Sequence, residues 1–191
     1  MKYTNPFHLG WLLAAAALVA CSDAEDDTGV DPLGAQRGSA WTESPYELGT
    51  PASDAWVVIN EVLAGASDDS SDWIELYNAD DEAVDLSAWR LTDDVDASPE
   101  EAWMLPADTW LAADEYLIVY ASDGEGSEPD GFHASFKCSK GGETLVLYDG
   151  YQTVADQIDV EELDDDEAYA RVADAARDWA ITGTPTKGTA N

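Results

Sequence analysis

Acidic side chains are the residues of this sequence with the clearest capacity for chemistry. The chain carries 41 Asp and Glu residues against 8 Lys and Arg, which gives a formal net charge of −33. These acids gather in four clusters, at residues 68–72, 93–96, 123–130 and 164–167. Calcium takes six to eight oxygen ligands, which loops rich in Asp and Glu can supply. Asp93, Asp94 and Asp96 are the candidate calcium ligands, because they closely follow a predicted strand.

None of the acidic clusters has the spacing of a dedicated calcium loop. Such a loop reads D-x-D-x-D-G with a Glu at its twelfth position, and the sequence lacks it. Solvated acidic loops are therefore the favoured interpretation, and we expect no cofactor, with calcium as the alternative. The negative charge would repel phosphate groups, so we expect no nucleic-acid partner.

A second possible site combines Asn60 and Glu61 with Glu75. A glycosidase needs two carboxyl groups at a set separation beside a sugar-binding cleft. In a chain this rich in acids such a pair arises easily by chance, so the signal is weak. The favoured interpretation is that Asn60 and Glu61 fix turns by hydrogen bonding. We expect no enzyme, and a small carboxylate hydrolase remains a distant alternative.

Histidine and cysteine chemistry is limited by the number of these residues. His8 falls in the N-terminal segment, so His133 is the only histidine in the rest of the chain. A zinc site built on histidines or on a cysteine pair is therefore excluded by count. No serine occurs in a G-x-S-x-G elbow that could use His133 as its base. Cys138 is expected to be a buried, inert thiol.

The N-terminal residues are typical of an export signal. Residues 9–20 form an apolar run, which is shorter than the roughly 20 residues that a membrane-spanning helix needs. Residues 18–21 read Leu-Val-Ala-Cys and resemble the lipobox of a bacterial lipoprotein. That resemblance implies that residues 1–20 are a cleaved signal peptide and that Cys21 carries the lipid. It predicts a protein anchored in the bacterial cell envelope, with the outer membrane favoured because Ser22 follows the cysteine.

The segment after the lipobox, residues 21–54, is predicted to be an acidic disordered tether that begins with the lipidated Cys21. It is rich in Asp, Glu, Gly, Pro, Ser and Thr and shows no sustained apolar periodicity. A segment of this kind cannot bury enough apolar surface to offset the entropy lost on ordering. We expect it to hold the following domain away from the membrane.

The remaining residues, 55–191, are predicted to form one domain of short strands that would position these candidate groups. Strands are expected at residues 57–63, 73–77, 84–91, 103–106, 116–121, 143–148, 153–160, 168–172 and 179–182. In the second of these, Ile74 and Leu76 alternate with polar or aromatic residues, which predicts a half-buried strand. The polar connector 78–82 has hairpin length, so the flanking runs are expected to pair. This spacing, with only one turn of helix expected at 174–178, predicts an all-β antiparallel sandwich.

Five tryptophans supply a large aromatic content in this domain. Protein interfaces are enriched in aromatic residues, and exposed rings are also common in carbohydrate sites. We expect core packing for most of them, with one or two exposed at loop tips. The residues are Trp73, Trp89, Trp103, Trp110 and Trp179.

An ordered series of motifs resembles the lamin-tail domain family over about residues 56–191. The series runs through INEV (59–62), DWIELYN (72–78), VDLSAW-x-L-x-D (84–93), LPADTWLAADEYLIVYA (105–121), FKCSKGGETLVLYD (136–149) and TPTKGTAN (184–191). The resemblance implies a compact immunoglobulin-like β-sandwich that is not itself an enzyme. Such domains occur in nuclear lamins and in many bacterial secreted or surface proteins.

The function that follows from this resemblance and from the predicted signal is non-catalytic. We expect a cell-envelope lipoprotein that displays a binding or structural module. Its partners would be the membrane, through the lipid anchor, and an unidentified protein or glycan. The alternative is a calcium-dependent adhesion or carbohydrate-binding module.

Overall fold

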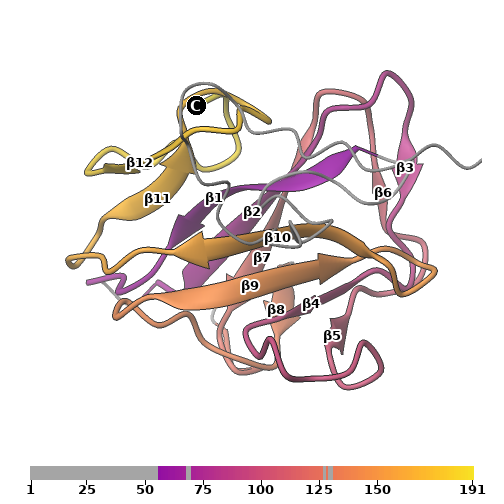
Figure 1. The fold of residues 1–191 in the computed structure, drawn as a ribbon, viewed down its shortest axis with the longest axis horizontal. Helices are drawn as coiled ribbons and strands as arrows, with labels where there is room; N and C mark the ends of the chain where they lie inside the picture. The colour runs from indigo at the N-terminus through magenta and orange to yellow at the C-terminus, as the bar shows by residue number, and fades with distance from the viewer. Residues whose placement is uncertain (1–55, 68–69, 127, 129–130) are drawn as a thin grey trace, which may run out of the picture. The chain divides into compact units, whose positions relative to one another are not determined.

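The structure is a computed structural model that describes residues 56–67, 70–126, 128 and 131–191. Every regular element in this part of the chain is a β-strand (Figure 1). Within the same residues no helix is long and apolar enough to cross a membrane. The predicted signal peptide 1–20, the lipid attachment site Cys21 and the predicted tether 21–54 lie outside the described residues.

The larger sheet contains six strands. They are β1 (Val57–Leu63), β2 (Asp72–Asn78), β7 (Tyr116–Ala121), β8 (Phe132–Ala134), β11 (Ala168–Arg171) and β12 (Trp179–Thr182). Their order across the sheet is β12-β11-β1-β2-β7-β8. All neighbours are antiparallel except β7 and β8, which run parallel and so depart from the expected antiparallel pattern.

The second sheet has four strands and faces the first across the hydrophobic core (Figure 1). It is formed by β10 (Val154–Val160), β9 (Glu143–Tyr148), β4 (Arg90–Thr92) and β5 (Trp103–Met104), in that order. A short ribbon of β3 (Val84–Asp85) and β6 (Trp110–Leu111) completes the fold.

The core lies between the inner faces of these two sheets. Its members alternate along β2, β7 and β9, as the pleat requires, and the core includes Ile59, Ile74, Leu91, Leu145 and Ile158. Trp89 is only 4% exposed and belongs to the same cluster, which confirms its predicted core position. The predicted class, an all-β immunoglobulin-like sandwich, is confirmed.

Strand β2 differs from its prediction because both of its faces are buried. Trp73 and Glu75, on the face expected to meet solvent, are 4% and 0% exposed. The C-terminal residues cover this face: the Gly188 amide donates to Glu75, and the Lys187 ammonium lies over the Trp73 ring. A segment more than a hundred residues away in sequence provides this cover, so the local alternation cannot reveal it.

The predicted hairpin between residues 73–77 and 84–91 is wrong. β2 pairs with β1 and β7 instead, and the connector carries the chain to β3 of the short ribbon. The run 84–91 is itself divided into β3 and β4 by a turn, in which Ala88 has a φ of 68° and the Trp89 amide donates to the Leu86 carbonyl at 3.0 Å. This turn allows the two halves to join different sheets.

Two of the short strands are not predicted from the sequence. β6 and β8 have two and three residues, too few to show a period. The helical turn expected at residues 174–178 is a non-helical turn, in which the Ala176 amide donates to the Ala173 carbonyl at 2.9 Å.

Candidate functional site

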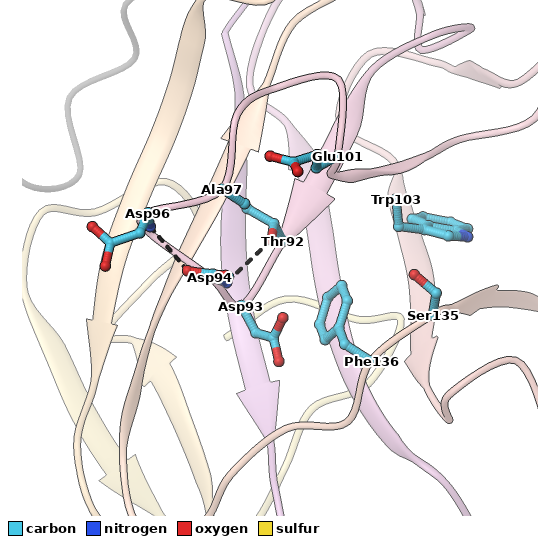
Figure 2. Close-up of a pocket in the computed structure, with 9 residues that line it drawn as sticks. All are labelled: Thr92, Asp93, Asp94, Asp96, Ala97, Glu101, Trp103, Ser135 and Phe136. Atoms are coloured by element: carbon cyan, nitrogen blue, oxygen red, sulfur yellow. Dashed lines mark hydrogen bonds between the residues drawn. The ribbon is translucent and has the colours of Figure 1, made fainter.

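An acidic and aromatic hollow lies between the loop that joins β4 to β5 and the residues that follow β8. Its volume is about 420 Å³. The groups around it are acids, small polar or apolar residues and two aromatic rings (Figure 2). They are Thr92, Asp93, Asp94, Asp96, Ala97, Glu101, Trp103, Ser135 and Phe136. We call this site the acidic hollow.

Hydrogen bonds within the β4–β5 loop hold its acids in place. The Asp94 amide donates to the Thr92 hydroxyl at 3.1 Å, and Asp94 Oδ1 accepts the Asp96 amide at 3.0 Å (Figure 2). Further along the loop, Glu101 Oε2 accepts the amide and the hydroxyl of Ser98 at 3.0 and 2.9 Å. Asp and Glu side chains that accept hydrogen bonds from nearby backbone amides stabilise tight turns. The acids of this loop therefore stabilise its conformation.

The aromatic side of the acidic hollow comes from two separate segments of the chain. Trp103 begins β5 and pairs with Leu91 of β4. Phe136 follows β8, and its carbonyl accepts the Asp123 amide at 2.9 Å, which ties this segment to the end of β7. Both rings are half-buried and pack against the main core while part of each remains accessible.

The electrostatics of the acidic hollow favour a cation. Burial, together with the neighbouring Asp94, raises the pKa of Asp93 above its ordinary value. The hydrogen bonds from Ser98 lower the pKa of Glu101 and so favour its charged form. None of the described residues that line the site is Lys or Arg. Four carboxyl groups beside two aromatic faces therefore form a region of negative potential that lacks a lining cation.

The structure places the calcium candidates Asp93, Asp94 and Asp96 on one loop but does not make them converge. The Asp93 carboxyl group points to the side of the hollow where Phe136 lies, whereas Asp96 points away from it (Figure 2). One oxygen of Asp94 is occupied by the Asp96 amide. Among the described residues no group of three or more His, Cys, Asp or Glu side chains is arranged to hold a metal ion.

Calcium is accordingly expected to stabilise the protein no more than magnesium does at equal ionic strength. Screening of a surface of net charge −33 is shared by all divalent salts, whereas a specific site would respond to one ion. Thermal unfolding in EDTA, in millimolar calcium and in millimolar magnesium, each at low and high sodium chloride, measures the difference. A calcium-specific shift that persists at high salt would contradict this expectation.

Asn60, Glu61 and Glu75, the weak glycosidase candidates, do meet in space, but all three side chains are fully buried. Asn60 Nδ2 donates to Glu75 Oε1 at 3.0 Å, and Asn60 Oδ1 accepts the amide of Ala175 in the turn after β11. These bonds agree with the interpretation that they fix turns. The two carboxyl groups lie beneath the C-terminal residues and do not face a substrate cleft.

His133 has partners that the sequence did not suggest. Its Nε2 lies 2.7 Å from the Glu128 carbonyl oxygen, which can only accept, so Nε2 carries the proton. Nδ1 then accepts the Ser122 hydroxyl at 3.0 Å. Ser122 is 6% exposed, and its hydroxyl already serves this contact. The pair fastens the end of β7 to β8 and leaves no accessible nucleophile.

Cys138 lies in the hydrophobic core, as expected. It is 9% exposed, and burial raises the pKa of its thiol well above the ordinary value. The thiolate is the reactive form, so a raised pKa makes this residue inert.

The tryptophans divide much as expected. Trp73 and Trp89 are buried, and Trp103 and Trp179 are half-buried. Trp110 is 61% exposed, in the β3–β6 ribbon. Tyr151, on the β9–β10 turn, is 91% exposed, and the sequence did not predict this exposure. A single exposed aromatic residue in a turn has no distinguishing pattern in sequence.

Sequence patterns point to the three aspartates of the acidic hollow but not to its two rings. Trp103 is one of five tryptophans for most of which core packing is expected, and Phe136 follows a strand of three residues that the sequence does not predict. The combination arises only when β5 and the segment after β8 come together across the end of the sandwich.

Comparison with known proteins places this sandwich in a family. Residues 50–162, more than half of the chain, match the family model described as Lamin Tail Domain. No curated protein matches the chain.

Proposed function

The chain belongs to the lamin tail domain family, and from this premise we propose that it is a non-catalytic binding module displayed in the bacterial cell envelope. A family built on an immunoglobulin-like sandwich supports a structural or binding role. The lipobox-like residues before Cys21 and the acidic segment 21–54 support lipid anchoring at a distance from the membrane. In this proposal the membrane is contacted only through the anchor.

The acidic hollow is the observation that carries the binding role. Carboxylates of Asp93, Asp94 and Glu101 attract a cation, and the rings of Trp103 and Phe136 offer it aromatic faces. A cation over an aromatic ring contributes about 0.5–2 kcal/mol, depending on how far it is desolvated. Arginine and lysine side chains are the cations that proteins present on their surfaces. We infer a protein partner that inserts an arginine or lysine side chain.

Blocked Gly-Arg-Gly and Gly-Lys-Gly peptides are expected to bind the full-length chain weakly and to quench tryptophan fluorescence. The isosteric Gly-citrulline-Gly peptide, which has no charge, is expected not to bind, because the carboxylates recognise the cation. Asp93→Asn and Trp103→Leu should each lower the affinity for the arginine peptide at least about fivefold, which corresponds to roughly 1 kcal/mol. Isothermal titration calorimetry measures all of these affinities.

The matched control is Asp178→Asn, because this change removes one exposed negative charge far along the chain from the β4–β5 loop. It should leave the affinity within about twofold of the original. Equal losses for Asp93→Asn and Asp178→Asn would mean that the peptide responds to net charge alone. Binding of a neutral oligosaccharide in place of the arginine peptide would point to a glycan partner instead.

A further inference from the structure

The C-terminal residues 184–191, which we call the C-terminal strap, are held on the outer face of the larger sheet by carboxyl groups. Glu61 of β1 accepts the Thr186 amide at 3.2 Å through Oε1 and at 3.0 Å through Oε2. Glu75 of β2 accepts the Gly188 amide at 2.6 Å. The Lys187 ammonium between them lies 4.4 Å from the centre of the Tyr120 ring. The strap is thus bound by hydrogen bonds that its backbone amides donate to two buried acids.

The two acids are direct neighbours. Glu61 and Glu75 lie opposite each other in the β1–β2 register, next to the irregularity between Ile59 and Glu61. Both are fully buried. Like charges directly opposite each other on paired strands are destabilising, and burial increases the cost of each charge. Ionisation of both carboxyl groups therefore destabilises the closed arrangement of this pair.

The Thr186 hydroxyl links Glu61 to Asn191 of the strap. Asn191 Nδ2 donates to the carbonyls of Asn60 and Arg171 at 3.2 and 2.9 Å, which fixes its amide orientation. Asn191 Oδ1 therefore faces the Thr186 hydroxyl, 2.7 Å away, as an acceptor. The same hydroxyl lies 2.9 Å from Glu61 Oε2, so its one hydrogen is shared between the two acceptors. Burial raises the pKa of Glu61, whereas the hydrogen bonds from Thr186 lower it.

Other charged and titratable groups surround this pair on every side. Asp174, in the turn after β11, accepts bonds from Asn60 Nδ2 and from the Tyr116 hydroxyl of β7. On β11, Arg171 directs its guanidinium to Asp156. On the outer side, the Tyr120 ring that Lys187 covers is stacked on His133. The donors to Glu61 and Glu75 themselves are amides and a hydroxyl, which do not neutralise a charge.

We propose that the C-terminal strap is a pH-sensitive latch, closed over β1 and β2 while the carboxyl groups of Glu61 and Glu75 share protons and released as they ionise. Release would uncover both acids and the rings of Trp73 and Tyr120. It would also free Lys187 from these rings.

The direction of the response follows from the protonation of Glu75. Burial, and then the Glu61 and Asp174 carboxylates, raise the pKa of Glu75 from 4.5 to about 7, against the hydrogen bonds of Asn60 and Gly188, which lower it. Burial also raises the pKa of Glu61. A raised pKa in the closed form means that the closed form binds the proton more tightly. The resulting stabilisation is complete below about pH 4.5 and is lost as the pH rises through about 7.

Hydrogen–deuterium exchange of the full-length chain tests the latch. If Glu75 regains its ordinary pKa on release, protection of residues 184–191 should fall about tenfold between about pH 6 and about pH 8.5, after correction for intrinsic exchange. The peptide that covers β7, Tyr116–Ala121, is the internal reference and should keep its protection. Equal protection of the strap at both pH values would overturn the proposal, even without any variant.

Two variants separate the acids from general charge effects. Glu75→Gln should abolish the pH-dependent loss of strap protection, whereas Glu162→Gln, an exposed acid, should leave it unchanged. Glu61→Gln should keep the strap protected at about pH 6, because its amide oxygen can still accept the Thr186 amide and its side chain carries no charge. A tenfold loss that survives in Glu75→Gln would show that another group releases the strap.

Discussion

Replacing Arg171 by Met is expected to lower the free energy of unfolding by about 3–5 kcal/mol. The side chains of Arg171 and Asp156 are both fully shielded from solvent, and Nη2 lies 2.9 Å from Oδ2 of the acid. Arg171 Nε also donates to the Ile59 carbonyl at 2.7 Å, and its guanidinium lies 4.5 Å from the centre of the Trp179 ring. Removal of the arginine would leave a buried carboxylate without its counter-charge.

The position of this ion pair explains why its loss should be global. Arg171 ends β11 in the six-stranded sheet, and Asp156 belongs to β10 in the four-stranded sheet. Asp156 Oδ2 also accepts the Ile59 amide of β1 at 2.8 Å. One buried cluster thus joins three strands from both sheets, so the sandwich cannot separate without breaking it.

Equilibrium urea unfolding of the full-length chain measures the effect of Arg171→Met. Burial raises the pKa of Asp156, although Arg171 lowers it, so the acid left alone should take up a proton more readily. The destabilisation should consequently be smaller near pH 5 than near pH 8. The control is Arg90→Met: this partly exposed arginine donates only to the carbonyls of Glu100 and Ala102, and its loss should cost about 1 kcal/mol or less. Similar losses for the two variants would show that the buried pair does not join the sheets.

Replacing Cys21 by Ser is expected to abolish membrane attachment of the protein. The thiol is the predicted site of acylation, and a serine hydroxyl would not be a substrate for that modification. Several acyl chains on one residue provide stable anchoring, whereas the acidic chain itself would be repelled by anionic headgroups. Cell fractionation and the mass of the N-terminal peptide measure attachment and acylation.

Cys138→Ser is the matched control for Cys21→Ser, because it changes the only other cysteine of the chain. Cys138 is buried in the sandwich core and should have no part in anchoring. This control protein is expected in the membrane fraction, with its N-terminal peptide still acylated. A Cys21→Ser protein found in the membrane fraction in the same amount would refute the lipoprotein proposal.

The run 84–91 and Glu75 show where local sequence carries too little information. The run 84–91 looks like one strand, because its alternation continues through Ser87 and Ala88. The left-handed conformation of Ala88 interrupts the strand, and an alanine in the sequence does not predict such a conformation. In the same way Glu75 alternates with Ile74 and Leu76 as a solvent-facing acid would, although the C-terminal strap buries it.

Local sequence by itself determined most of the strands and the class of fold. The bounds of β7, β9 and β12 agree with their predictions because each strand has enough residues to show its pattern of side chains. The ordered motifs likewise identified the family, and the acid count determined the charge.

Tertiary structure alone decided which strands pair and which side chains meet. The two rings of the acidic hollow, the Arg171–Asp156 pair and the acids beneath the strap each join segments that are distant in sequence. Their contacts depend on burial, and burial depends on how the sheets and the C-terminal residues pack together. An acid in solvent and an acid under a strap have the same local sequence, but only the second gains its proton near neutral pH.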